Sequence, residues 1–204
     1  MRSPAAHARV STVLLCLAFC APIVSTAQTT APATAASTTV APTIRIDNFG
    51  RINANYYRGA QPQGRDYADL ASLGVRTIVN LTSDDADAGE KAMAERAGLR
   101  YEQLPMTTRR PPTGEEVARF LAIVDDPANQ PVYVHCVGGR HRTGVMTAGY
   151  SMTHDGWTAD QAFAEMKQYK FGADFLHPEF KAFVYGYRPV LAQAASKSTT
   201  RSGS

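Results

Sequence analysis

Residues 132–144 read VYVHCVGGRHRTG, and this stretch decides both the fold class and the place where we expect chemistry. The apolar run Val132-Tyr133-Val134 is typical of a buried strand, and the residues from about Thr143 to His154 are typical of a helix. Between them lie Gly138 and Gly139, which permit the positive φ values and the close backbone approach of a tightly curved loop. The stretch therefore predicts a strand, a loop and a helix in direct succession.

The loop of this unit has the features of a phosphate-binding site. Its N–H groups can curl around one point, and the helix that follows directs the positive end of its dipole there. The residues expected to bind phosphate in this way are Val137, Gly138, Gly139, Arg140 and His141. Arg142 can in addition meet two phosphate oxygens with its planar guanidinium group.

Cys136 stands at the end of the strand and faces the same point. A free thiol ionises near pH ~8.5, but a helix N-terminus and nearby cations make ionisation easier. We therefore expect a thiolate that attacks phosphorus and takes the phosphoryl group covalently. Two alternatives are a buried cysteine without chemistry and a metal site of His135, Cys136 and His141, which lacks the paired spacing of usual zinc ligands. Neither explains the glycines and the arginine, so no metal or other cofactor is expected.

Six positions of the stretch match a family signature. His135-Cys136, Gly139 and Arg142-Thr143-Gly144 fit HC-x-x-G-x-x-R-[ST]-G, and the chain resembles the cysteine-dependent protein tyrosine and dual-specificity phosphatases. Tyr57–Pro62 and Gly74–Leu81 resemble the opening of the compact bacterial and fungal dual-specificity-like group, which includes inositol-pyrophosphate phosphatases. The resemblance covers about residues 44–190. It implies that Thr143 hydrogen-bonds the sulfur and that His135 braces the loop. The alternative for Thr143 is an ordinary cap at the helix N-terminus.

The same resemblance gives the residues around the loop two possible roles. Arg140 and His141 point outward in such loops, where they contact substrate groups beyond the reacting phosphate or are simply solvated. Arg58 and Gln61 either reach the rim of the pocket or fix the N-terminal segment by hydrogen bonds.

The chain departs from the family at the general acid, the group that protonates the leaving oxygen. Family members place an aspartate about thirty residues before the cysteine, and Thr108 stands at that spacing here. Asp84 or Asp85 is the nearest substitute, although we favour both as N-terminal caps of a helix that starts at Ala86. Otherwise the substrates have good leaving groups, such as phenols or phosphoanhydrides, and Arg109 and Arg110 bind a polyanionic substrate.

Strands and helices alternate along the chain. Strands are predicted at 56–58, 77–81, 99–104 and 132–135, and helices at about 65–73, 86–97, 113–125, 143–154, 158–169 and 178–193. Capping boxes at Thr113-x-x-Glu116 and Thr158-x-x-Gln161 support two of these helices. The alternation predicts an α/β fold with a central, mostly parallel sheet flanked by helices. Ligands of such folds bind beyond the carboxyl ends of the strands, where Cys136 lies.

The two ends of the chain differ from this domain. Residues 1–27 read as a secretory signal peptide, with basic residues, an apolar stretch and small residues before a cleavage site. A Thr/Ala/Pro-rich linker (28–43), the phosphatase domain (44–193) and a disordered tail (194–204) follow. We expect a periplasmic or secreted protein. A stable membrane anchor is not expected, because the apolar stretch is short for a membrane span. A lipoprotein modified at Cys20 is disfavoured, because bulky Phe19 stands where a small residue is expected.

Export would leave a nearly neutral protein with one cysteine. Cys16 and Cys20 leave with the signal peptide, so Cys136 has no disulfide partner. Loss of Arg2 and Arg9 lowers the net charge from +3 to +1, which gives no support for nucleic-acid binding. Three functions fit the sequence: a phosphatase for phosphotyrosine or mixed phosphoproteins, a phosphatase for inositol polyphosphates or pyrophosphates, and a phosphate-binding pseudo-phosphatase. The intact Cys136 and Arg142 argue against the third.

Overall fold

The central sheet of the protein is mostly parallel, as the alternation of elements predicts. The computed structural model describes residues 43–83 and 85–189. Its five strands are β1 (Gly50–Asn53), β2 (Tyr56–Ala60), β3 (Thr77–Asn80), β4 (Arg100–Gln103) and β5 (Val132–Cys136), in the spatial order β1-β2-β5-β3-β4. Only β1 runs antiparallel, along β2; the other three pairings are parallel. The predicted α/β fold class is confirmed.

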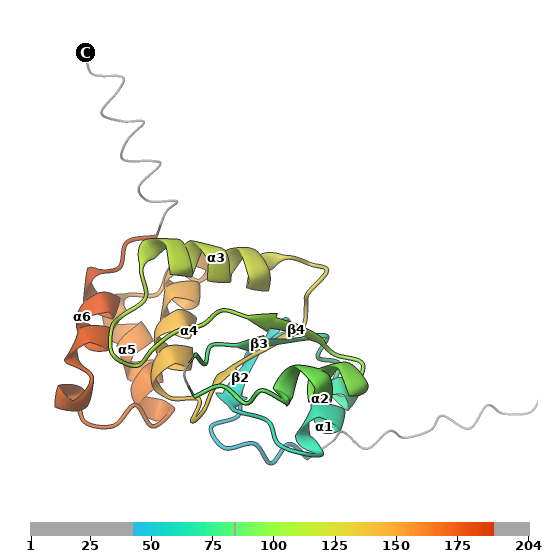
Figure 1. Ribbon diagram of the computed structural model, residues 1–204. Helices are drawn as coiled ribbons and strands as arrows, with labels where there is room; N and C mark the ends of the chain where they lie inside the picture. The colour runs from blue at the N-terminus through green and yellow to red at the C-terminus, as the bar shows by residue number, and fades with distance from the viewer. Residues whose placement is uncertain (1–42, 84, 190–204) are drawn as a thin grey trace, which may run out of the picture. The chain divides into compact units, whose positions relative to one another are not determined.

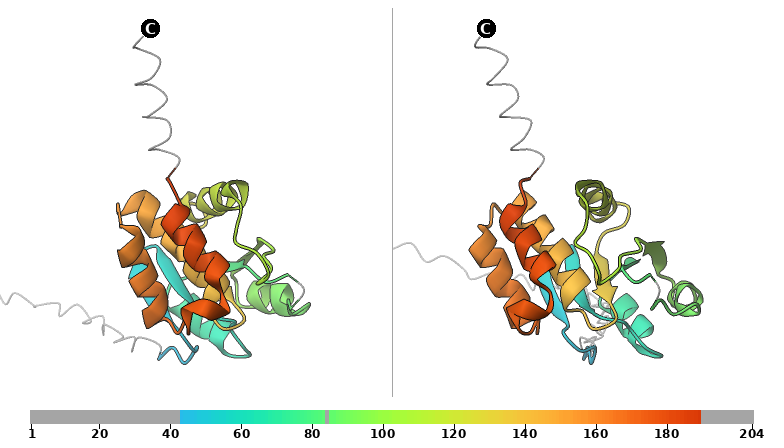
Figure 2. Two further views of the ribbon diagram at one scale, coloured as in Figure 1. Left: turned by 90° about the vertical axis from the view of Figure 1, so that its left-hand side faces the viewer. Right: turned by 60° about the vertical axis from the view of Figure 1, so that its left-hand side comes forward.

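Helices cover both faces of this sheet (Figure 1). They are α1 (Asp66–Ser72), α2 (Glu90–Arg96), α3 (Gly114–Asp125), α4 (His141–His154), α5 (Ala159–Gln168) and α6 (Pro178–Gly186), with a 3₁₀ turn at Asp174–Leu176. One apolar cluster joins the sheet to α1 and α2, and another joins it to α3, α4, α5 and α6. In Figure 2 these two groups of helices lie on opposite sides of the strands.

Strand β5 sits in the middle of the sheet, and its position places the loop that follows it. All five of its residues are buried, because it pairs with β2 on one side and with β3 on the other. Cys136 lies beside Ala60, and His135 lies between Gly59 and Asn80. Helix α4 continues from the loop and is buried over most of its length by α3, α5 and α6. The loop is therefore held between two rigid elements of the core.

Local signals predicted some element boundaries well and others badly. Both capping boxes are formed, at the starts of α3 and α5. Helix α2, however, begins at Glu90 and not at Ala86, so the expected capping role of Asp85 is wrong. Helix α6 ends at Gly186, because the proline at position 189 disfavours helical backbone before it and Tyr187 is already extended. Strand β1 and the 3₁₀ turn were not predicted.

Several predictions fall outside the described residues. These are the signal peptide with Cys16 and Cys20, the linker up to residue 42, Asp84, residues 190–193 and the tail 194–204. Among the helices that the structure does describe, none has the length and apolar character needed to cross a membrane.

Candidate active site

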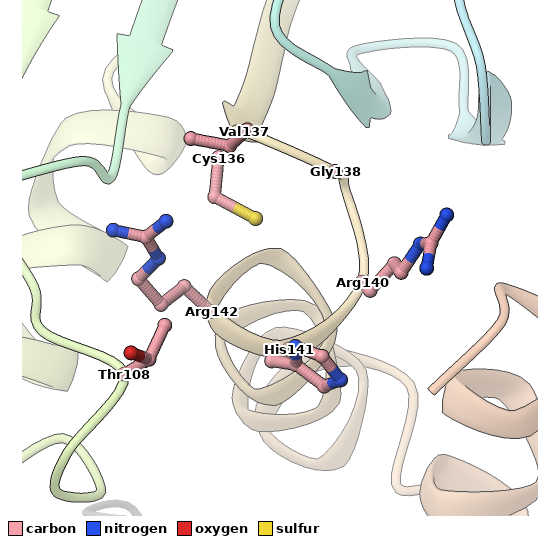
Figure 3. Close-up of a pocket in the computed structure, with 7 residues that line it drawn as sticks. All are labelled: Thr108, Cys136, Val137, Gly138, Arg140, His141 and Arg142. Atoms are coloured by element: carbon pink, nitrogen blue, oxygen red, sulfur yellow. The ribbon is translucent and has the colours of Figure 1, made fainter. Parts of the chain in front are cut away.

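A pocket opens at the carboxyl end of β5, where the sequence places the chemistry. Its volume is about 340 Å³, and it is lined by Thr108, Cys136, Val137, Gly138, Arg140, His141 and Arg142. In Figure 3 the sulfur of Cys136 points into this space, Arg142 and Thr108 lie on one side of it, and Arg140 extends away from Cys136 on the other. The structure thus brings the predicted nucleophile, arginine and loop together, and Thr108, which stands at the sequence spacing of the family aspartate, also lines the pocket.

Three consecutive carbonyl groups of the loop are held by donors that lie outside it. The carbonyls of Val137, Gly138 and Gly139 accept from Gln61 N–H (3.1 Å), Asn48 Nδ2 (2.9 Å) and Arg58 Nη2 (2.8 Å), respectively. In a planar trans peptide the carbonyl oxygen and the next N–H point in opposite directions. The N–H groups of residues 138–140 are therefore turned away from these donors, as a site for phosphate oxygens requires.

The two glycines of the loop differ in what they do. Gly139 has φ +64°, and a Cβ there would lie 2.3 Å from the carbonyl carbon of Gly59. Only glycine fits this position, because the backbone of β2 approaches so closely. Gly138 has no positive φ, and a Cβ there would meet nothing closer than the Arg140 side chain at 3.4 Å. The expectation of positive φ is confirmed for Gly139 and wrong for Gly138.

The guanidinium group of Arg142 is almost fully buried, with 3% of the side chain exposed, and its fork is occupied. Nη1 and Nη2 donate to the two carboxylate oxygens of Asp85 at 2.8 and 2.6 Å, and Nη1 also donates to the carbonyl of Met106. Nε is buried and has no hydrogen-bond partner among the described residues. A phosphate would satisfy this free donor, but it would compete with Asp85 for the other two.

This pairing bears on Asp85 as the replacement for the missing acid. The hydrogen bonds from Arg142 lower the pKa of Asp85 below its usual value, against a smaller opposing effect of burial. A carboxylate that is ionised at neutral pH has no proton to give to a leaving group. In the arrangement observed here, Asp85 acts as a counter-ion to Arg142.

His135 points away from the pocket and into a buried polar cluster. Its Nε2 lies 2.9 Å from Glu90 Oε1, and both side chains are fully buried. Glu90 also accepts hydrogen bonds from Asn80 Nδ2 (2.6 Å), Tyr67 OH (3.3 Å) and Tyr101 OH (3.5 Å). Neither ring nitrogen of His135 makes a well-aligned hydrogen bond among the described residues, so close packing and the 2.9 Å contact with Glu90 hold it beside this cluster of residues from α1, α2, β3 and β4. This placement is consistent with the bracing role, which stays a prediction. Sequence reasoning missed Glu90, because nothing local marks it as buried.

Arg58 is buried behind the loop and does not reach the pocket rim. Its Nη1 contacts both carboxylate oxygens of Glu165 at 2.7 and 2.9 Å, and its guanidinium group lies 4.0 Å from the centre of the Tyr169 ring. Burial raises the pKa of Glu165 above its usual value, although the charge of Arg58 opposes this. Of the two roles considered for Arg58, the structure supports fixation by hydrogen bonds, and the segment that it fixes is the catalytic loop.

The basic residues around the pocket carry less free charge than the sequence suggests. His141 Nε2 lies 3.0 Å from the carbonyl oxygen of Phe171. Burial lowers the pKa of His141, only partly opposed by that carbonyl, so the ring is neutral at pH 7. The fork of Arg110 is taken by Glu116 at 2.6 and 2.9 Å, beside the N-terminus of α3. Arg140 is 46% exposed and lies 3.8 Å from Asp47.

The alternative metal site does not assemble. His135 turns to Glu90 and His141 turns to Phe171, so the two imidazoles do not converge on Cys136. Throughout residues 43–83 and 85–189, no group of three or more side chains of the metal-ligating types is placed to hold an ion.

A strand, a curved loop and a helix that bring a cysteine and an arginine to one anion pocket define a cysteine-dependent phosphatase. The family model described as a DSP-PTPase phosphatase fused to NAD⁺ kinase matches residues 42–181, and the chain belongs to this family of dual-specificity-like phosphatases. It is similar to the dual specificity protein phosphatase TpbA of Pseudomonas aeruginosa strain PAO1, with 31% identity over 161 residues, 79% of this chain and 70% of that protein.

Two further comparisons extend this likeness. The inositol diphosphatase DSP2 of rice (Oryza sativa subsp. japonica) is 27% identical over 126 residues, 60% of this chain and 61% of that protein. The crystal structure of a cysteine-to-serine variant of P. aeruginosa TpbA in complex with pTyr superposes with a TM-score of 0.62 and 29% identity, over 76% of this chain and 92% of that chain. The protein is therefore a cysteine-based phosphatase with the fold that the sequence predicts.

Proposed function

We propose that this phosphatase hydrolyses phosphotyrosine in proteins, with activity on mixed phosphoprotein substrates of the dual-specificity type. The observation that carries the proposal is the convergence of Cys136, Arg142 and three inward-turned N–H groups on one pocket. The binding of pTyr by the TpbA variant supports an aromatic substrate.

The reaction follows from this arrangement in two steps. The Cys136 thiolate attacks phosphorus, an S–P bond forms, and the P–O bond to the leaving group breaks. Arg142 and the N–H groups of residues 138–140 stabilise the three non-bridging oxygens while their charge grows. Water then attacks phosphorus, the S–P bond breaks, and phosphate leaves while the thiolate is restored. The hydroxyl of Thr143, buried and without a partner among the described residues, is proposed to hydrogen-bond the departing sulfur.

Tyrosine suits this pocket because its phenol is a good leaving group. No carboxylic acid is found among the described residues that line the pocket, and in the structure Asp85 is paired with Arg142. An aryl ester needs less protonation than an alkyl ester, so phosphotyrosine should react faster than phosphoserine or phosphothreonine. Phosphoanhydrides also have good leaving groups, which keeps an inositol pyrophosphate as the second candidate, in line with the rice relative.

The charge around the pocket favours phosphotyrosine over that polyanion. A pyrophosphate needs several cations beyond the reacting phosphate, but Arg110 is paired with Glu116 and His141 is neutral. Of the basic residues that line the pocket beside Arg142, this leaves Arg140, which is 46% exposed and 3.8 Å from Asp47. A singly phosphorylated aromatic side chain makes no such demand.

We also propose that the protein is exported to the periplasm or secreted. The support is the composition of residues 1–27: basic residues, an apolar run and small residues before position 28. Sequencing the N-terminus of the protein recovered outside the cytoplasm tests this, with cleavage expected after Ala27. A full-length chain recovered from the cytoplasm alone would contradict export.

The substrate class is tested with a panel of phosphotyrosine, phosphoserine and phosphothreonine peptides beside an inositol pyrophosphate. Phosphotyrosine should give the highest kcat/KM, and a preference for the pyrophosphate would overturn the proposal. Cys136→Ser should abolish turnover while it leaves the thermal unfolding midpoint near that of the wild type, because a serine hydroxyl there stays protonated. Chelators should leave the rate unchanged.

A further inference from the structure

Asn48 lies outside the pocket, but its side chain contacts the catalytic loop from behind. The Nδ2 amide donates to the carbonyl of Gly138 at 2.9 Å and to the carbonyl of Tyr169 at 3.2 Å. Both acceptors are carbonyl oxygens, so the nitrogen end of the amide is assigned without ambiguity. The backbone of Asn48 has φ +55°, a left-handed conformation that asparagine tolerates better than most residues. The position thus demands both an unusual backbone and a side chain with two donors.

The contact reaches the phosphate site through a single peptide group. The Gly138 carbonyl and the Gly139 N–H lie on opposite sides of this peptide, so holding the carbonyl outward turns the N–H toward the anion. A peptide flanked by two glycines reorients at low cost, because neither side has a Cβ to restrict it. If it flipped, an acceptor would replace a donor at the phosphate. The two adjoining carbonyls have their own donors, Gln61 N–H and Arg58, which leaves the middle one to Asn48.

The segment that carries Asn48 is itself anchored at several points. The carbonyl of Asp47 accepts from the Ala60 N–H at 2.9 Å, beside the end of β2, and Asp47 pairs with Lys170. Tyr169, the second acceptor of Asn48, packs against the Arg58 guanidinium group that holds the next loop carbonyl. Asn48 therefore joins the end of α5, the start of the domain and the loop in one rigid contact.

We propose that Asn48 is a positioning residue for the phosphate site, which holds the Gly138–Gly139 peptide so that the Gly139 N–H faces the transferring phosphate. The inference rests on the proposed function for the identity of the anion. It predicts that loss of the Asn48 amide weakens anion binding in the pocket and leaves the nucleophile itself accessible.

Two variants separate the side chain from the backbone conformation. Asn48→Gly keeps the positive φ and removes the amide, whereas Asn48→Asp keeps the size and replaces the donor with an acceptor. Asn53→Asp is the matched control, since Asn53 is also half-buried and donates one hydrogen bond, to Tyr150 OH at 2.9 Å, without touching the loop.

The readouts are inhibition by inorganic phosphate and alkylation of Cys136 by two reagents. Iodoacetate is an anion and benefits from the loop N–H groups, whereas iodoacetamide is neutral and does not. Both Asn48 variants should raise the Ki of phosphate roughly five- to tenfold and lower the iodoacetate-to-iodoacetamide rate ratio by a similar factor, with the iodoacetamide rate unchanged. Asn53→Asp should leave the Ki and the ratio at wild-type values.

Several outcomes would overturn the inference. A folded Asn48→Gly protein with wild-type phosphate inhibition would show that the amide is not needed. Equal slowing of both alkylations would point to a general disordering of the loop around Cys136. If Asn48→Gly does not fold, Asn48→Ala removes the amide without adding a charge and provides the same comparison. Failure of the wild type to hydrolyse phosphotyrosine would refute the proposed function instead, and the alkylation ratio would still decide the role of Asn48.

Discussion

Replacing Asp85 with asparagine should tighten phosphate binding. In the structure the Asp85 carboxylate occupies the Arg142 fork at 2.6 and 2.8 Å, so an incoming phosphate has to displace it. Asparagine has nearly the same size, but it carries no charge and can offer the fork only one oxygen. The change therefore weakens the competitor and leaves Arg142 in place.

The size of the effect follows from how exposed the pair is. The Asp85 side chain is 41% exposed, so solvent screens the interaction, and the appropriate range is that of partly exposed ion pairs, about 0.2–1 kcal/mol. The two-bond geometry places it near the upper end. A gain of about 1 kcal/mol corresponds to a roughly fivefold lower Ki for inorganic phosphate.

The pH dependence of this effect has a definite sign. Because Arg142 lowers the pKa of Asp85 below its ordinary value of 3.8, the carboxylate stays ionised from neutral pH down to mildly acidic pH. The ratio of wild-type to variant Ki should be constant over that range. It should shrink toward one only as the pH falls through the lowered pKa, where the wild-type carboxyl group also loses its charge.

The assay is competitive inhibition of aryl phosphate hydrolysis, with Asp87→Asn as the control. Asp87 lies in the same loop and accepts a hydrogen bond from Gly89 N–H at 2.7 Å, so its replacement removes the same charge without a direct effect on Arg142. An unchanged Ki in Asp85→Asn would refute the reasoning. A large rate loss confined to poor leaving groups would instead identify Asp85 as a general acid.

Three further predictions test the catalytic site and the residues that support it. Arg142→Lys keeps the charge but loses the two-pronged geometry, so kcat/KM for an aryl phosphate should fall by about 10²–10³, and near-full activity would contradict bidentate binding. Gly139→Ala forces a Cβ to within 2.3 Å of the Gly59 carbonyl carbon at φ +64°. It should lower the free energy of unfolding by more than about 1 kcal/mol in a denaturant titration and abolish phosphate binding. Gly138→Ala, whose Cβ has its nearest contact at 3.4 Å, should change the free energy of unfolding only slightly. Arg110 lowers the pKa of Glu116 from 4.5 to about 2, so Glu116 contributes stability above its unfolded pKa that is lost as the pH falls toward 2. Glu116→Gln, which keeps the capping box, should be less stable than the wild type by up to about 1 kcal/mol at pH 7 and equal to it near pH 2. An equal difference in stability at both pH values would contradict this.

The parts of the fold that sequence reasoning predicts are those whose signals are local. The strand–loop–helix unit, the close-approach glycine at Gly139 and both capping boxes depend on residues within a few positions of one another. The start of α2 was missed because Asp84 and Asp85 resemble helix caps, whereas Asp85 is drawn to Arg142, 57 positions away. Rules for helix caps consider only neighbouring residues, so they cannot detect that a distant arginine binds the aspartate instead.

The supports of the catalytic loop could not be predicted for the same reason. Asn48 is 90 positions from Gly138, and Arg58 is 107 positions from Glu165. Glu90 is an ordinary helical residue in the sequence, and only the packing of α2 against β3 and β5 buries it beside His135. Each of these contacts is a tertiary one between polar residues, which hydrophobic periodicity does not report.

The chemistry of the leaving group is limited by what the described pocket can donate. His141 is the remaining titratable side chain there, but its Nε2 faces the Phe171 carbonyl and therefore carries the ring proton, since the ring is neutral at pH 7. Its other nitrogen is then an acceptor and cannot protonate a leaving oxygen. With Asp85 paired to Arg142 in the structure and Thr108 at the spacing of the family aspartate, we expect the leaving group to depart with little assistance from these side chains. Rates should therefore fall steeply as the leaving-group pKa rises, so that aryl phosphates far outpace alkyl phosphates. A flat dependence would show that an acid of the protein supplies the proton, and the Asp85→Asn variant would show whether that acid is Asp85.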